Sequence, residues 1–93
     1  MAIFVALGRS TDEGLKHLGG FAQRHEQAVK RAESLGGKVL TSYALMGEYD
    51  FRVILECLDA TTALKILVKE AEGGNVRYQT LTAIPVEEFS AII

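Results

Sequence analysis

Residues 38–58 read KVLTSYALMGEYDFRVILECL, and this stretch decides the fold. Two runs of strand-forming residues flank the dipeptide Gly47-Glu48. Because glycine adopts positive φ at little cost, we predict a β-hairpin with a two-residue type II′ turn. That turn places Met46 opposite Tyr49, and the pairs that follow outward are Leu45 with Asp50, Ala44 with Phe51, Tyr43 with Arg52, Ser42 with Val53, Thr41 with Ile54, Leu40 with Leu55 and Val39 with Glu56.

The predicted register sorts the hairpin residues into two sets, because side chains alternate between the faces of a strand. One set suits a face covered by helices: Met46, Tyr49, Ala44, Phe51, Ser42, Val53, Leu40, Leu55 and Cys57. The other set mixes apolar with ionisable side chains: Leu45, Asp50, Tyr43, Arg52, Thr41, Ile54, Val39 and Glu56. This second face is too apolar for open water and too polar for an ordinary core, so it is the first place to look for a site.

The rest of the chain supplies two more strands and the helices that connect them. Residues 2–9 are apolar at both side-chain parities, which is typical of a central strand covered on both faces. Ser10 to Glu13 fit a capping box, which predicts a short helical turn over 11–18 with Ser10 as its N-cap. Apolar residues at helical spacing predict amphipathic helices over 21–35 and 60–72, the second capped by Asp59. Residues 75–84 form the fourth strand, and Pro85 starts a short helix over 86–93. The apolar side chains of this helix are expected to dock on the sheet, with the closing of a pocket mouth or the binding of a neighbouring subunit as alternatives: Phe89, Ile92 and Ile93.

The order βαββαβ within 93 residues predicts one domain, residues 1–93, with an α+β, ferredoxin-like fold. This fold has a four-stranded antiparallel sheet with two helices on one face. The opposite face is bare in a monomer, although the hairpin places Leu45, Ile54 and Tyr43 there. Large exposed apolar patches mark interaction surfaces. We therefore predict a two-fold homodimer in which two sheets enclose a barrel-like space, with any higher assembly left open.

The composition excludes several classes of protein. The chain is 48% hydrophobic and 24% charged, and no apolar run approaches the roughly 20 residues of a membrane span. Ten basic residues stand against twelve acidic ones, with no basic cluster that suits a nucleic-acid backbone. The first residues lack the basic leader of a signal peptide, and the single Cys57 suits a reducing compartment, so we expect a cytoplasmic protein.

The tetrapeptide Gly47-Glu48-Tyr49-Asp50 carries a Gly-x-Tyr-Asp signature, and in this the chain resembles the GYD domain family. Supporting segments cover nearly the whole chain: Thr11-Asp12-Glu13-Gly14, Gly36-Gly37, Tyr43 four residues ahead of Gly47, and Gly74-Asn75-Val76-Arg77. The resemblance implies the dimeric α+β barrel group, whose members include small cofactor-independent monooxygenases and other proteins with ligand pockets.

Tyr43, Asp50 and Arg52 form the strongest candidate site, because the predicted register puts all three on the mixed face with Tyr43 directly across from Arg52. A guanidinium can hold an anionic ligand bidentately, and a phenol beside it can donate a hydrogen bond or act as a base. The alternative is structural: Asp50 pairs with Arg52 and accepts from amides of the turn, while Tyr43 packs over them at the dimer interface. Tyr49 has the opposite parity and is expected in the core or at its rim.

His25 falls about 40° from Phe21 on the apolar stripe of the first long helix. There it is a candidate to line a pocket between helix and sheet or to move a proton, and the alternative is a neutral, hydrogen-bonded structural histidine. His17 is expected in solvent. Because His17, His25, Glu26 and Cys57 match no ligand spacing, we predict no metal site, and no cofactor motif is present.

Three functions fit these residues. The first is a non-catalytic homodimeric binding or assembly module that holds a small organic ligand between sheet and helices, with Tyr43, Arg52, Asp50 and His25 as ligand-binding residues. The second is an enzyme like the cofactor-independent monooxygenases or isomerases of the dimeric α+β barrel group, in which Tyr43 and Arg52 orient an enolisable or phenolic substrate and His25 or Asp50 moves a proton. The third is a pure oligomerisation or regulatory partner. We favour the first, because no recognisable catalytic set is present.

Overall fold

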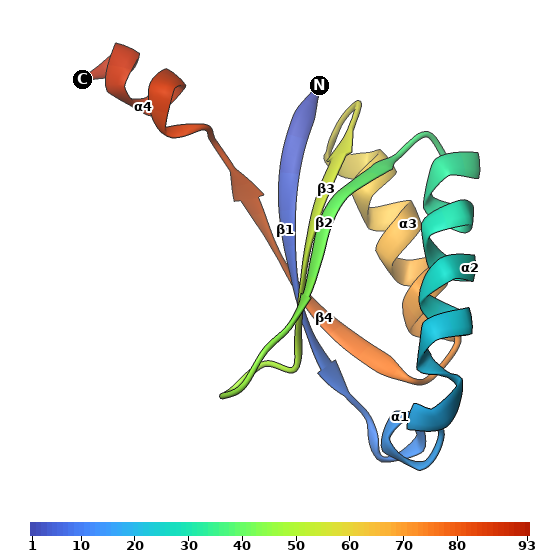
Figure 1. Ribbon diagram of the computed structural model, residues 1–93. Coiled ribbons are helices and arrows are strands. Elements are labelled where there is room, and N and C mark those ends of the chain that lie inside the picture. Colours follow the sequence, from blue (N-terminus) through green and yellow to red (C-terminus); the bar gives the residue numbers. More distant parts are fainter.

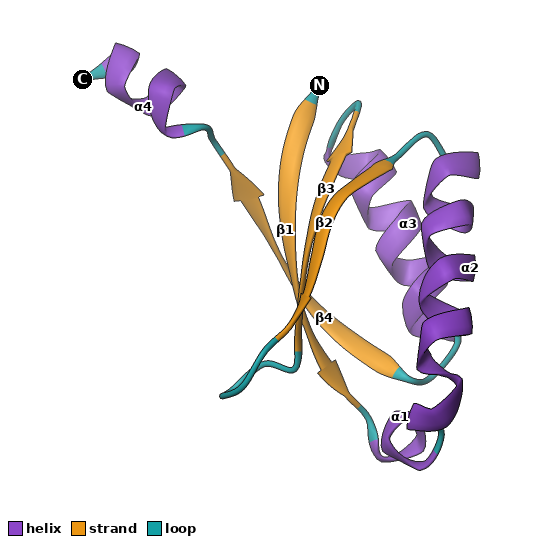
Figure 2. Ribbon diagram, in the orientation of Figure 1, coloured by secondary structure: helices purple, strands orange, loops and turns teal.

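The computed structural model describes the whole chain, residues 1–93. Figure 1 traces the elements in chain order and Figure 2 separates helices from strands. The order is β1 (Ala2–Ser10), α1 (Asp12–Lys16), the 3₁₀ turn η1 (Leu18–Gly20), α2 (Phe21–Ser34), β2 (Lys38–Ala44), β3 (Phe51–Cys57), α3 (Ala60–Glu72), β4 (Val76–Ala83) and α4 (Val86–Ile92).

The four strands form one antiparallel sheet in the order β2-β3-β1-β4. Helices α2 and α3 lie side by side on one face, while the other face carries no helix (Figure 1). Strand β1 lies between β3 and β4, as predicted from its apolar residues at both odd and even positions. The α+β, ferredoxin-like fold is therefore confirmed, and we refer to the two faces of its sheet as the helix face and the open face.

The core lies between the helix face and helices α2 and α3. Its buried side chains come from alternate positions of the strands and from one stripe of each helix: Phe4, Ala6, Leu55, Cys57, Ala32, Ala63 and Ile66. The expected burial of Cys57 is confirmed, and burial raises the pKa of its thiol. Only ten of the 93 residues are buried, so a monomer has a small core with which to offset the entropy of folding.

The predicted hairpin register is correct from Ala44 opposite Phe51 to Thr41 opposite Ile54. Beyond it the ladder shifts, and Val39 faces Leu55 rather than Glu56. One extra residue in β2, at Leu40, accounts for the shift, because a bulge moves every later side chain to the opposite face. The expectations for Leu40 and Val39 were therefore wrong: Val39 packs against the core, and Leu40 is exposed.

The prediction of a tight two-residue turn at Gly47-Glu48 was also wrong. The strands end at Ala44 and resume at Phe51, and the amide of Leu45 donates to the carbonyl of Asp50 at 2.7 Å as the last bond before a wider loop. Gly47 does have positive φ, at 132°. The loop opens because Asp50 turns toward the neighbouring strand, where its amide donates to the carbonyl of Gly8 at 2.8 Å.

The helix ends follow local capping rules. Asp59 caps α3 as predicted, and its carboxylate accepts from the amide and hydroxyl of Thr62 at 2.9 and 2.8 Å. The N-cap of α1 is Thr11 rather than Ser10, because the Thr11 hydroxyl is the group that accepts from Gly14. No helix combines the length and hydropathy that a bilayer crossing requires.

Helix α4 does not dock on the sheet as expected. It extends past the end of β4, away from the rest of the molecule (Figure 1). Its apolar side chains are left in the open, with Phe89 52% and Ile92 76% exposed. The chain thus ends in an apolar projecting arm.

Candidate functional site

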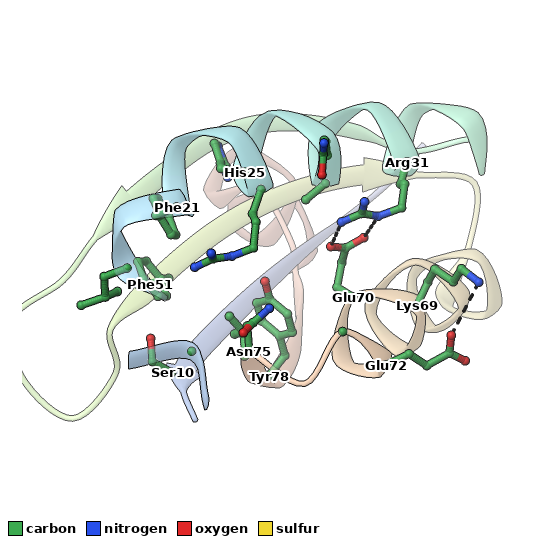
Figure 3. Close-up of a pocket in the computed structure, with 17 residues that line it drawn as sticks. Ser10, Phe21, His25, Arg31, Phe51, Lys69, Glu70, Glu72, Asn75 and Tyr78 are labelled. Atoms are coloured by element: carbon green, nitrogen blue, oxygen red, sulfur yellow. Dashed lines mark hydrogen bonds and ion pairs between the residues drawn. The ribbon is translucent and has the colours of Figure 1, made fainter. Parts of the chain in front are cut away.

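A cleft of about 450 Å³ opens on the helix face, between α2, the C-terminal end of α3 and the start of β4. This volume lies within the roughly 300–1,000 Å³ of typical ligand pockets. We name it the helix-face cleft, and Figure 3 shows the side chains that surround it.

The floor of the cleft exists because β1 carries glycine at the critical position. Phe51, Gly8 and Tyr78 form one row across β3, β1 and β4. A Cβ on Gly8 would lie 3.0 Å from the Tyr78 ring, so the missing side chain makes room for that ring above the central strand. The Tyr78 hydroxyl points up into the cleft toward α2 (Figure 3) and has no hydrogen-bond partner in the protein.

One wall of the cleft is a stack of three parallel rings. Phe21 of α2 lies 5.0 Å from Phe51 and 5.8 Å from His25, centroid to centroid, with interplanar angles of 10° and 7°. Positions 21 and 25 share one face of the helix because they are four residues apart. His25 therefore lines a pocket between helix and sheet, which was one of the two expectations for it. The alternative of a hydrogen-bonded histidine does not hold, because neither ring nitrogen bonds to the protein.

The charges around the cleft are unevenly paired. Arg31 of α2 binds Glu70 of α3 through two hydrogen bonds of 2.8 and 2.7 Å, and this contact raises the pKa of Arg31. Burial, and then the Glu70 charge, raise the pKa of Tyr78, which keeps its phenol protonated. Arg24 is half buried and donates only to the carbonyl of His17, at 2.6 Å, with no acidic partner. Arg24 is thus the guanidinium at the cleft that is free to bind an anion.

The residues predicted for the mixed face are divided by the structure. Arg52 lies over the Tyr43 ring at 5.1 Å on the open face, so these two meet as expected. Asp50 is not with them, because its carboxylate accepts from the amide of Ser10 at 2.8 Å. His25 lies on the other side of the sheet. No single site therefore contains all four residues.

The prediction that Tyr49 lies in the core or at its rim, which relied on strand alternation, was wrong. It lies on the open face, where its hydroxyl donates to Gln79 of β4 and Arg9 stacks on its ring at 4.8 Å. Alternation fails here because Tyr49 lies in the loop between β2 and β3, outside the paired strands. Glu48 completes the contact with an ion pair to Arg9 at 2.6 Å. The Gly-x-Tyr-Asp loop thus binds the central strand and an edge strand together.

A second contact joins two more of the segments that suggested the family, Thr11 to Gly14 and Gly74 to Arg77. The amide of Thr11 donates to the carbonyl of Asn75 at 3.0 Å, and the Thr11 hydroxyl donates to the carbonyl of Gly74. Gly14 packs so closely on Asn75 that a Cβ would overlap its carbonyl oxygen. These segments therefore hold α1 against the start of β4 rather than forming a reactive group.

Of the residues that line the cleft, sequence reasoning named His25 as a site residue and missed Arg24 and Tyr78, along with the place of Phe21 and Phe51 in the same cleft. The signals were present: Arg24 follows Phe21 by three positions on one helix face, and alternation along the last strand puts Tyr78 on the helix face. No three His, Cys, Asp or Glu side chains lie close enough together to hold a metal ion.

Comparisons with known proteins bear on the fold and the family of this chain. The family model described as GYD domain matches residues 4–93. A Thermus thermophilus protein named "Glutamine synthetase and cystathionine beta-lyase binding protein" is 34% identical over 92 residues, which cover 98% of this chain and 97% of that protein. Among solved structures, FFRP-DM1 matches with a TM-score of 0.64, at 19% identity over 90% of this chain and 100% of that one. TTHA0845, also from Thermus thermophilus, matches with a TM-score of 0.58, at 19% identity over 90% of this chain and 94% of that one. The two structures show the shared fold, and the matches to the family model and to the Thermus relative show that the chain belongs to the GYD domain family.

Proposed function

We propose that this chain is a non-catalytic, homodimeric binding module that associates with metabolic enzymes in the cytoplasm and holds a small organic ligand in the helix-face cleft. The observation that carries the proposal is the 34% identity with a relative, matched over 97% of its length, whose name says that it binds glutamine synthetase and cystathionine beta-lyase. An adaptor of this kind needs surfaces for partners rather than a reactive centre.

The open face supports the dimer. It presents apolar side chains that no helix covers, none of which is fully buried: Ile3, Val5, Leu7, Tyr43, Ile54 and Leu81. A second copy of the sheet would remove this area from water, and burial of apolar area is the main favourable term in association. The Tyr43–Arg52 pair would then lie in the interface between the two copies, which is the role we assign to both residues.

The projecting arm supports contact with a larger protein. Helix α4 exposes Phe89 and Ile92. A dimer formed through the open faces would carry two such arms, one from each copy. Aromatic and aliphatic side chains of this kind act as anchors when a partner offers a pocket for them. We assign α4 to the enzyme interface.

The cleft supports the ligand. His25 and Tyr78 line it, and neither the Tyr78 hydroxyl nor the His25 ring nitrogens form a hydrogen bond within the protein, so these atoms are free to bond a ligand. Of the residues predicted to bind a ligand, His25 is the one that we assign to this role. Asp50 is not among the residues that line the cleft, and its carboxylate is bonded to the amide of Ser10.

The test uses the intact chain with purified glutamine synthetase and cystathionine beta-lyase from the organism that encodes it. Surface plasmon resonance is expected to give saturable binding to at least one enzyme, with a dimer mass by analytical ultracentrifugation. Phe89→Ser should weaken enzyme binding and keep the dimer, whereas Arg52→Ala should weaken the dimer. A monomer that binds neither enzyme would refute the proposal.

A further inference from the structure

The helix-face cleft combines an aromatic surface with one unneutralised positive charge. Phe21 and Phe51 stack at 5.0 Å on one side, and Tyr78 forms the floor over Gly8 (Figure 3). Flat, apolar walls of this kind favour a planar ring, because offset and edge contacts between rings add to the area that is buried.

The charge comes from Arg24. It stands one helical turn from Phe21 on the same face of α2, and both side chains line the cleft. A single donor of its five is engaged, by the carbonyl of His17. The other arginine of the cleft, Arg31, is already neutralised by Glu70. One free guanidinium therefore suits a ligand with one negative charge.

Two acidic residues narrow the choice of anion. Glu70 and Glu72 also line the cleft, and each is paired with a cation, Arg31 and Lys69 respectively. A dianion such as phosphate would meet these carboxylates with only Arg24 uncommitted, so a monovalent carboxylate is favoured over it.

We propose that the helix-face cleft binds a planar aromatic carboxylate, with its ring against Phe21, Phe51 and Tyr78 and its carboxylate on Arg24. This inference deepens the ligand-binding part of the proposed function and rests on it. The Tyr78 hydroxyl is placed to donate a second hydrogen bond, and as a protonated phenol it does so without adding charge. His25 closes the ring stack at the other end.

The probe for the test is 2-naphthoate, with the uncharged 2-naphthalenemethanol as its matched control, and binding is followed by calorimetry and by amide chemical shifts. Saturable binding of the naphthoate is expected, with shifts in α2 and around Tyr78. Arg24→Gln should weaken naphthoate roughly ten- to hundredfold, the usual effect of losing a charge-assisted hydrogen bond, and leave the alcohol unchanged. Tyr78→Phe should weaken naphthoate about two- to tenfold. Lys30→Gln, on the same helix and paired only with Glu26, should change neither.

Three results would overturn the inference: no saturable naphthoate binding at millimolar concentration, equal affinity for the alcohol, or an unchanged affinity in Arg24→Gln. Retention of the native amide spectrum separates a lost contact from a lost fold. The enzyme-binding and ultracentrifugation measurements are independent of this titration. A chain that forms the dimer and binds an enzyme but not naphthoate would refute the ligand class alone.

Discussion

Replacing Asp50 by alanine tests the claim that the Gly-x-Tyr-Asp loop stabilises the fold by bonding to β1. The Asp50 carboxylate accepts a half-buried hydrogen bond of 2.8 Å from the amide of Ser10. Its loss removes a charge-assisted bond and leaves that amide without a partner, and each effect is worth roughly 1–3 kcal/mol. Because both describe the same bond, we expect Asp50→Ala to lower the free energy of unfolding by about 2 kcal/mol. For a domain of roughly 60–100 residues this corresponds to a fall in Tm of roughly 8–16 °C.

The same loop offers a matched control in Glu48. Its ion pair with Arg9 is shorter, at 2.6 Å, but the two side chains are 74% and 51% exposed. Exposed pairs contribute roughly 0–1 kcal/mol, so Glu48→Ala should change stability little. Asp50→Asn, which keeps an acceptor oxygen, should fall between the two.

The assay is urea unfolding followed by circular dichroism, at one fixed protein concentration because self-association would shift the midpoint. The claim is refuted if Glu48→Ala lowers the free energy of unfolding as much as Asp50→Ala does. It is also refuted if Asp50→Ala stays within about 0.5 kcal/mol of the wild type, which is the usual effect of a surface substitution.

Three further perturbations probe other parts of the fold. Gly14→Ala should destabilise by about 1–3 kcal/mol, because the new Cβ would overlap a carbonyl oxygen at the start of β4, whereas Gly19→Ala meets nothing within 4 Å; thermal melts compare the two. Hydrogen bonds from the first turn of α3 lower the pKa of Asp59. A lowered folded-state pKa gives stability that is present above the unfolded value of about 3.9 and is lost as the pH falls through the folded one. Wild type should therefore lose more stability than Asp59→Asn as the pH falls from about 5 to about 3, measured by urea unfolding at each pH. A double-mutant cycle on Arg31→Ala and Glu70→Ala should give a coupling free energy of about 1 kcal/mol, because the ion pair is bidentate but Arg31 is partly exposed. A coupling near zero would mean that the ion pair between α2 and α3 does not stabilise the fold.

The fold was predictable from the sequence because its signals are local. The period of two along residues 41–44 and 51–54 gave the correct hairpin pairs, and the glycine-led loop lies where it was expected. The bulge at Leu40 was not predictable in this way, because Leu40 and Val39 are both apolar and either suits a core position. Packing of Val39 beside Leu55 decides between the two registers, and packing is a tertiary effect.

The site was less predictable, because its parts come from distant segments. Phe21 and Tyr78 are brought together only by the strand order β2-β3-β1-β4, with Gly8 as the spacer between β3 and β4. The predicted cluster of Tyr43, Asp50 and Arg52 was wrong in the position of Asp50, for a different reason. The prediction applied strand alternation to Asp50, which belongs to a loop and bonds across to β1.

The central strand links the family signature to the cleft. The carbonyl of Gly8 accepts from the amide of Asp50, while the bare Cα of the same residue makes room for the Tyr78 ring on the helix face. The amide of Ser10, two residues later, is held by the Asp50 carboxylate. The loop is therefore bonded to the same end of β1 on which the Tyr78 floor of the cleft packs. Asp50→Ala should then loosen the cleft without touching it, so that naphthoate binding weakens in this variant even under conditions where it remains folded, while Glu48→Ala binds as the wild type does. Equal naphthoate affinity in the two variants would show that the loop and the cleft are energetically independent.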